Sequence, residues 1–182
     1  MRTRRISCTV AALAALAVAC GGPAGPSEEA VAWTNRVCDA LSGFTRAATT
    51  GPQIDPADPV AAVQELDRYL AATSEELQRS LTALGAVGGS PVDGGDAYVA
   101  RLEEALRGIR SGFDTAREQL AAVDVSNAEQ LATAVPGAMA PLQELRNLPS
   151  PTEGLRDTEE LGAASEQAEQ CRALRSSAAQ GG

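Results

Sequence analysis

Histidine and lysine are both missing from the 182-residue sequence. Without histidine there is no imidazole to act as a general base or to activate a serine or cysteine, and without lysine there is no Schiff-base chemistry. The histidine-dependent motifs for a di-iron centre and for haem attachment cannot be built either. No G-x-S-x-G or G-x-x-x-x-G-K pattern occurs. We therefore expect a protein that is not an enzyme and that holds no cofactor.

Carboxylates are the main chemical resource that remains, and they gather near the C-terminus. The cluster consists of Asp157, Glu159, Glu160, Glu166 and Glu169. A calcium site or a glycosidase would need these groups to converge, whereas a helix spreads them along two separate lines. A sugar site would also want aromatic platforms, and the chain has one Trp. We expect a solvated acidic face and no metal site, so an enzyme of unknown class ranks last among the functions.

Aromatic residues are few, which limits how a core can be filled. They are Trp33, Phe44, Tyr69, Tyr98 and Phe113. Alanine, leucine and valine must therefore supply most of the buried volume, and this composition suits closely packed helices better than a sheet. The composition predicts an all-α fold.

The first 19 residues have the pattern of a secretory signal. Three arginines, Arg2, Arg4 and Arg5, precede an apolar run from Ile6 to Ala19, and no acidic residue interrupts it. The run is shorter than the ~20 residues that a helix needs to span a bilayer. Residues 1–19 are therefore predicted to be a removable signal peptide, which makes the protein an exported one.

Cys20 follows the apolar run directly, as in a bacterial lipobox, where the thiol receives a diacylglycerol before cleavage. The small residues Ala17-Val18-Ala19 also fit an ordinary signal peptidase. Both interpretations cut before Cys20 and differ in whether its thiol carries lipid. Cys8 leaves with the leader, so lipidation would leave the even pair Cys38 and Cys171 for a disulfide in an oxidising compartment. We expect membrane attachment through Cys20, with simple secretion as the alternative.

Negative charge dominates the mature chain. Three of the 15 basic residues lie in the leader, so 12 arginines face 24 acidic residues after cleavage, a net charge of −12. Binding to nucleic acid, or to an anionic membrane through a basic face, needs positive charge beside phosphate. We expect no nucleic-acid partner, and we expect lipid rather than charge to hold the protein at the membrane.

Apolar residues recur every three or four positions over long stretches, which predicts amphipathic helices. The clearest stripe consists of Val99, Leu102, Leu106, Ile109, Phe113, Ala116, Leu120 and Val123. On the opposite face, Glu103 with Arg107 and Arg110 with Asp114 are four residues apart, which predicts modest ion pairs on a solvated surface.

Capping signals place the other helices. A short helix opens at Ser27, and a long one runs from the cap Asp58 to Gly85. Two weaker helices begin at capping-box sequences that start at Ser126 and at Ser150.

These signals divide the mature chain into three parts. Residues 20–26 are the lipidated cysteine and a flexible tether, residues 27–175 form an antiparallel bundle of four to five helices, and residues 176–182 form a disordered tail.

The segment AVPGAMAP, residues 134–141, places two prolines inside an expected helix. Each proline removes a hydrogen bond and crowds the preceding turn, so a kink or break is predicted near residues 135–138. Such a break can open a groove for an apolar ligand, and its candidate lining residues are Val135, Pro136 and Met139. The simpler interpretation, which we prefer, is that the bundle bends there around its own core.

Cys38 lies in the first mature helix and Cys171 near the end of the last one. If five helices alternate up and down, the first and fifth run parallel, and the two cysteines fall at comparable heights. A bridge between them would constrain the unfolded chain by about 5 kcal/mol in the chain-entropy model. A redox dithiol is the less favoured alternative, because the C-x-x-C motif is absent.

Five features together resemble a group of small secreted proteins and lipoproteins of actinobacteria. They are the short leader, the W-x-x-x-V-C-D-A-L motif from Trp33, the V-x-G-G-D and A-R-x-x-L stretches from Val92 and Ala116, and the single cysteine, Cys171, near the C-terminus. The resemblance covers most of the mature chain. It implies a location in the envelope and a helical domain stapled by cysteines, and it supplies no catalytic residues.

The leading expectation is a noncatalytic interaction or structural module on the outer face of the cytoplasmic membrane, where it faces the cell wall. Its partner would be another envelope protein, docked on an exposed helix face. The alternative is a carrier for an apolar small molecule held between helices near residues 134–141.

Overall fold

The computed structural model describes residues 25–55, 57–147 and 154–180. Within these ranges all regular elements are helices and no strand is present. The elements are α1 (Glu28–Thr50), α2 (Pro59–Gly85), α3 (Gly95–Ala121), α4 (Ala128–Asn147), the 3-10 helix η1 (Gly154–Asp157), α5 (Glu159–Gln167) and α6 (Glu169–Gln180). The prediction of an all-α fold is confirmed.

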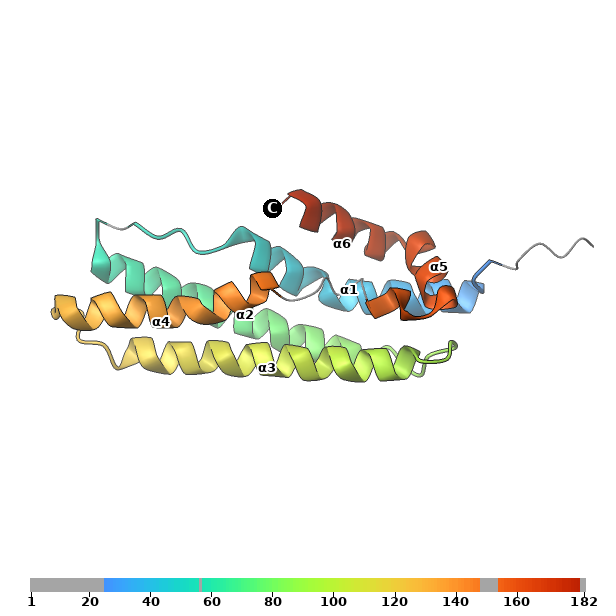
Figure 1. Cartoon of the computed structure of the whole chain (residues 1–182), viewed down its shortest axis with the longest axis horizontal. Helices are drawn as coiled ribbons and strands as arrows, with labels where there is room; N and C mark the ends of the chain where they lie inside the picture. Colours follow the sequence, from blue (N-terminus) through green and yellow to red (C-terminus); the bar gives the residue numbers. More distant parts are fainter. Residues whose placement is uncertain (1–24, 56, 148–153, 181–182) are drawn as a thin grey trace, which may run out of the picture.

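Four long helices follow one another as an antiparallel array. Figure 1 shows α1 to α4 as rods that run alternately in opposite directions, and each packs against the next along the chain. The shorter α5 and α6 lie on α1, on the side away from α3. The helical bundle is as expected, and its N-terminal and C-terminal helices are neighbours.

The core is built mainly from aliphatic side chains, as the shortage of aromatics requires. Leu66, Leu70 and Leu77 of α2 are completely buried, together with Phe113 of α3, and Trp33 of α1 is almost so. Of the stripe predicted on α3, Leu106, Phe113, Ala116 and Leu120 are buried, while Val99, Leu102 and Ile109 pack against the core and stay partly exposed. Burial of these stripes supplies the main stabilisation of such a bundle.

The predicted helix starts are partly right. Ser27 accepts a hydrogen bond from the Ala30 N–H through its hydroxyl, and the carboxylate of Asp58 accepts one from the Ala61 N–H. The predicted cap at Ser126 is wrong by one residue: Asn127 accepts from the N–H groups of residues 129 and 130. The hydroxyl of Ser126 instead donates to Asp124, because a neighbouring carboxylate within the turn is the stronger acceptor.

The turn between α2 and α3 packs against the start of α1. Gly94 has a φ of +80°, a conformation that other residues rarely adopt. Gly95 is buried, and a Cβ atom placed on it would lie 2.0 Å from the Ser90 Oγ and 3.1 Å from the Trp33 ring. A side chain at position 95 would force Ser90 or Trp33 to move, so the V-x-G-G-D stretch is a close-packed turn.

Helix α4 contains Pro136 and Pro141 and is nevertheless continuous from Ala128 to Asn147. Of the kink or break predicted near residues 135–138, the break is therefore absent, and the kink stays a prediction. The local loss of two N–H donors is tolerated because α4 packs along the length of α3, and tertiary packing outweighs local propensity.

The C-terminal region differs from the single helix expected there. The capping box that starts at Ser150 lies outside the described residues, and α5 begins instead at Glu159, after Thr158 accepts a hydrogen bond from the Leu161 N–H. Ala168 then separates α5 from α6 with an extended backbone. Helix α6 continues to Gln180, so residues 176–180, expected to belong to a disordered tail, are helical.

Candidate binding groove and disulfide

The two cysteines expected to pair are bonded. Cys38 of α1 and Cys171 of α6 form a disulfide with a Cα–Cα distance of 5.0 Å, and the two residues are separated by 133 positions in the sequence. Cys38 is 1% exposed and Cys171 is fully buried. The bridge joins the first long helix to the last helix, as predicted.

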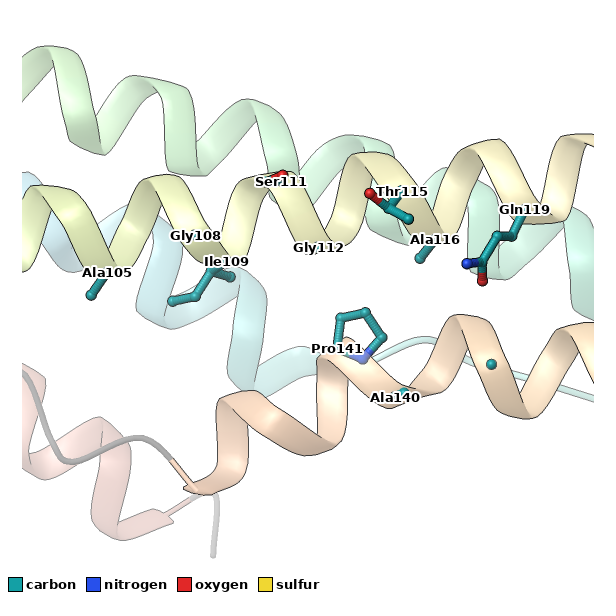
Figure 2. A pocket seen from close by; sticks show the side chains of 11 residues that line it. Ala105, Gly108, Ile109, Ser111, Gly112, Thr115, Ala116, Gln119, Ala140 and Pro141 are labelled. Carbon is teal, nitrogen blue, oxygen red and sulfur yellow. The ribbon is translucent and has the colours of Figure 1, made fainter.

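An apolar groove runs between α3 and α4. It has a volume of about 580 Å³. Figure 2 shows the α3 side chains above and Ala140 and Pro141 of α4 below, with the groove between the two ribbons. Its lining residues are Ala105, Gly108, Ile109, Ser111, Gly112, Thr115, Ala116, Gln119, Gly137, Ala140 and Pro141.

Small residues create this groove. Gly108 has nothing within 4 Å of the place where a Cβ would be, and a Cβ on Gly112 would come 3.7 Å from the Pro141 ring. The missing side chains leave space on α3 that α4 does not fill. Most lining residues are exposed and Ala116 is buried, so the groove is open to solvent and is not an enclosed cavity.

A few polar groups lie at the edges of the groove. Ser111, Thr115 and Gln119 come from α3, and Figure 2 shows the Gln119 side chain extending towards α4. The Gln119 Oε1 lies 3.6 Å from the position of a Cβ on Gly137. An apolar surface with a few polar groups at its edge suits binding by shape and burial.

The residues predicted to line a pocket are near the groove but not in it. Val135 and Met139 are partly buried and pack against the core, while Pro136 is exposed. The groove is lined instead by Gly137, Ala140 and Pro141 of the same AVPGAMAP segment. The groove residues of α3 were not predicted from the sequence. The signal that could have identified them is Gly108 and Gly112, two glycines four positions apart in an otherwise strong helix.

The polar face of α3 pairs with solvent-exposed partners and with α2. The two predicted ion pairs are present, with Arg107 Nη2 at 2.6 Å from Glu103 Oε2 and Arg110 Nε at 3.8 Å from Asp114 Oδ2. The Ser74 hydroxyl donates to the Asp114 carboxylate across 2.9 Å, which links α2 to α3. Exposed pairs of this kind contribute at most about 1 kcal/mol each, so this face is a solvated surface.

The C-terminal acidic residues do not converge. Asp157 pairs with Arg101 of α3 at 3.0 Å, and Glu159, Glu160, Glu166 and Glu169 are exposed. Among the described residues, no group of three or more potential ligands could hold a metal ion. Beside this pair, burial raises the pKa of Tyr98 well above its usual value, and the Asp157 charge raises it further while Arg101 opposes both.

The predicted lipidation site Cys20 and the predicted leader, residues 1–19, lie outside the described residues. In the part of the chain that the structure describes, no helix is both long enough and apolar enough to cross a bilayer. Comparison of the chain with protein-family models, with curated proteins and with solved structures found no match.

Proposed function

We propose that the protein is an exported lipoprotein, anchored through Cys20 to the outer leaflet of the cytoplasmic membrane, and that it is a noncatalytic interaction module. The sequence supports the anchor: a basic start, a short apolar run and a cysteine that directly follows small residues. The single observation that carries the interaction role is the open apolar groove between α3 and α4.

The groove suits a segment of another protein because it is long, is open to solvent and has polar groups only at its edges. Its lining runs from Ala105 to Gln119 along α3, which at 1.5 Å per residue is about 21 Å of helix. A helix or extended segment with small and apolar side chains could lie along it, as amphipathic helices do in hydrophobic grooves. The partner on this proposal is another envelope protein that presents such a segment.

Anchoring is tested by replacing the cysteine. The full chain and Cys20→Ala are expressed with the native leader in an actinobacterial host, and the protein is measured in membrane and culture medium. We expect the unmodified chain in the membrane, with the mass of a diacylglycerol on residue 20, and the variant in the medium. An unmodified thiol at residue 20 in the exported protein contradicts the anchor and leaves the groove proposal standing.

Docking is tested by photocrosslinking in the membrane-bound protein. A photoreactive phenylalanine analogue replaces Gly108 in the groove or, as a matched control, Ala72, which is exposed on α2 outside the groove. We expect a discrete protein adduct from position 108 that position 72 does not give. Equal adducts from both positions, or none from position 108, contradict docking at this groove.

A second candidate function is a carrier of an apolar small molecule, which the volume of the groove supports. About 580 Å³ lies within the ~300–1,000 Å³ of small-molecule pockets. The exposure of the lining argues against it, because carriers bury most of the ligand surface. Native mass spectrometry of the purified protein separates the two: a copurified ligand lost in Gly108→Leu but retained in Ala72→Leu favours the carrier.

A further inference from the structure

We infer that the protein that docks at the groove is a second molecule of this same chain, and that the two molecules pair antiparallel through the exposed sides of their α3 helices. The inference rests on the docking proposed above and names its partner. Pairs of identical chains related by a two-fold axis are the commonest protein assemblies. The residues that α3 presents to solvent favour such a pair.

The exposed side of α3 has the spacing of a helix–helix contact. In the described ranges α3 packs mainly against α2, α4 and η1, and Figure 1 shows it along one edge of the bundle. One line of its exposed positions alternates in steps of three and four, the repeat with which two helices pack along their length. These positions, here called the α3 seam, are Arg101, Glu104, Gly108, Ser111, Thr115 and Glu118. The seam therefore has the geometry to receive one further helix.

Small residues fill the middle of the α3 seam. Gly108, Ser111 and Thr115 form its centre, and Ala105 and Gly112 lie beside it on the side of the groove. Such residues let two helix backbones approach closely, so that van der Waals contact is gained along both backbones. Because the central residues of the seam also line the groove, two copies that meet at the seam cover part of each other's groove.

Charge selects one register for the antiparallel pair. Arg107 and Asp114 flank the seam on the side of α2, and the two-fold axis of an antiparallel pair places this flank against the same flank of the other copy. When Gly108 lies opposite Ser111 of the second copy, Arg107 comes beside Asp114 of that copy. A shift by one heptad sets Asp114 against Asp114 in one direction and Arg107 against Arg107 in the other. Like charges disfavour both shifted registers.

The same register pairs the charged ends of the seam. Arg101 comes opposite Glu118 of the second copy, and the two-fold axis gives every such contact twice. Within its own chain Arg101 pairs with Asp157 at 3.0 Å. Arg107 likewise pairs with Glu103 at 2.6 Å. A guanidinium has several N–H donors, so each arginine can hold a second carboxylate while it keeps the first.

The net charge of the chain makes this face a favourable one for self-association. Residues 20–182 hold 12 arginines against 24 carboxylates, so two copies repel each other over most of their surface. The seam together with Arg107 and Asp114 has two arginines and three carboxylates, and residues 131–141 of α4, beside the groove, include no charged side chain. Two copies therefore meet here with little repulsion.

The area of this face suits a weak but specific pair. With 27 residues in α3 and 20 in α4, the two helices are about 40 Å and 30 Å long. Packed ~10 Å apart, they present a face ~20 Å wide, or roughly 600–800 Å² per copy. Specific interfaces bury about 800 Å² per partner. An interface of this size without bulky side chains needs a high local concentration, which anchoring of both copies in one membrane supplies.

Photocrosslinking in the membrane tests the identity of the partner. A photoreactive phenylalanine analogue replaces Ala105, which lines the groove beside the seam, or the control Ala72, exposed on α2. The host makes tagged and untagged forms of the full chain. We expect position 105, and not position 72, to give an adduct of twice the chain mass that contains both forms and is crosslinked within α3 or α4. Equal adducts of twice the mass from both positions overturn the pairing.

The other outcomes separate this inference from the docking proposed above. An adduct of position 105 with a different protein alone overturns the second copy as partner and leaves docking at the groove standing. An adduct of twice the mass that is crosslinked outside α3 and α4 overturns the antiparallel arrangement. Absence of any adduct overturns the pairing, and the crosslinking at position 108 then decides docking by itself.

A charge exchange tests the register. Glu118→Arg places an arginine opposite Arg101 of the other copy, whereas Glu75→Arg makes the same charge change at an exposed position of α2. We expect Glu118→Arg to lower the yield of the adduct of twice the mass at least about fivefold and Glu75→Arg to keep it. The double variant Arg101→Glu with Glu118→Arg is expected to regain the yield, and circular dichroism checks that each variant stays helical. Equal yields in Glu118→Arg and Glu75→Arg overturn the register, and so does a double variant that regains nothing.

Discussion

The indole Nε1 of Trp33 donates a hydrogen bond to the backbone oxygen of Gly88, 3.0 Å away, and so fastens the start of α1 to the turn between α2 and α3. Arg36 strengthens the same junction, because its guanidinium donates to the Val87 oxygen at 3.2 Å and 3.3 Å. The single Trp of the chain is therefore a core residue that also joins α1 to the α2–α3 turn at one end of the bundle.

Because this junction is tightly packed, one methyl group added at Gly95 is expected to lower the free energy of unfolding. Gly95→Ala places a Cβ 2.0 Å from the Ser90 Oγ and 3.1 Å from the Trp33 ring, so the turn or the indole must move. We expect a loss of roughly 1–3 kcal/mol in the free energy of unfolding, the usual cost of overpacking, measured by urea denaturation. Gly89→Ala is the control, because a Cβ there meets nothing within 4 Å. Equal stability of the two variants would show that the turn yields freely.

Two buried threonines are expected to differ in how the free energy of unfolding changes when each is replaced by valine. Thr34 and Thr73 are both almost completely buried. The Thr73 hydroxyl donates to the Tyr69 carbonyl oxygen across 2.8 Å, while the Thr34 hydroxyl has no partner. We expect Thr73→Val to lower the free energy of unfolding by about 1 kcal/mol, and Thr34→Val to leave it unchanged or raise it by up to about 1 kcal/mol. The measurement is thermal unfolding, and a clear loss of stability in Thr34→Val contradicts the assignment.

The absence of lysine gives an unusually simple prediction for alkaline pH. Near pH 10 the two tyrosines are the side chains that titrate in the mature chain besides any free cysteine thiol, because arginine stays charged. Burial raises the pKa of Tyr98 and that of Tyr69 above the ordinary value of 10.0. A raised pKa in the folded state means that the neutral phenol is the stabilised form. The stabilisation is complete below the unfolded value and is lost as pH rises above it.

We therefore expect the free energy of unfolding to be constant from about pH 8 to pH 9.5 and to fall from about pH 10 upward. The loss is measured by urea denaturation at each pH. Tyr98→Phe is expected to flatten this fall, because Tyr98 is more deeply buried than Tyr69. A fall of the same steepness in Tyr98→Phe would show that Tyr98 does not govern the alkaline transition.

The sequence predicts the fold better than the groove, for a physical reason. Stripes such as that from Leu106 to Leu120 are properties of one helix, and the capping side chains Ser27 and Asp58 act on their own turns, so each is visible locally. The continuity of α4 through Pro136 and Pro141 depends on packing against α3. That packing cannot be read from the local sequence of α4. The groove is defined by side chains that are missing, and its position depends on how two helices are placed relative to one another.

The glycines of α3 connect stability to the proposed function. Gly108 lies inside a long helix, where glycine costs about 1 kcal/mol relative to alanine, and a Cβ there would meet nothing within 4 Å. Gly108→Ala is therefore expected to raise the free energy of unfolding by roughly 0.5–1 kcal/mol, measured by thermal or urea denaturation. Gly112→Ala should gain a similar amount, because its Cβ would lie 3.7 Å from Pro141, an ordinary contact.

The double variant narrows the groove while it stabilises the protein. If docking uses the groove, the partner adduct in the crosslinking experiment, with the photoreactive group moved to Ala140, should weaken as stability rises. A chain that gains stability and keeps its full adduct would show that these two glycines do not serve binding.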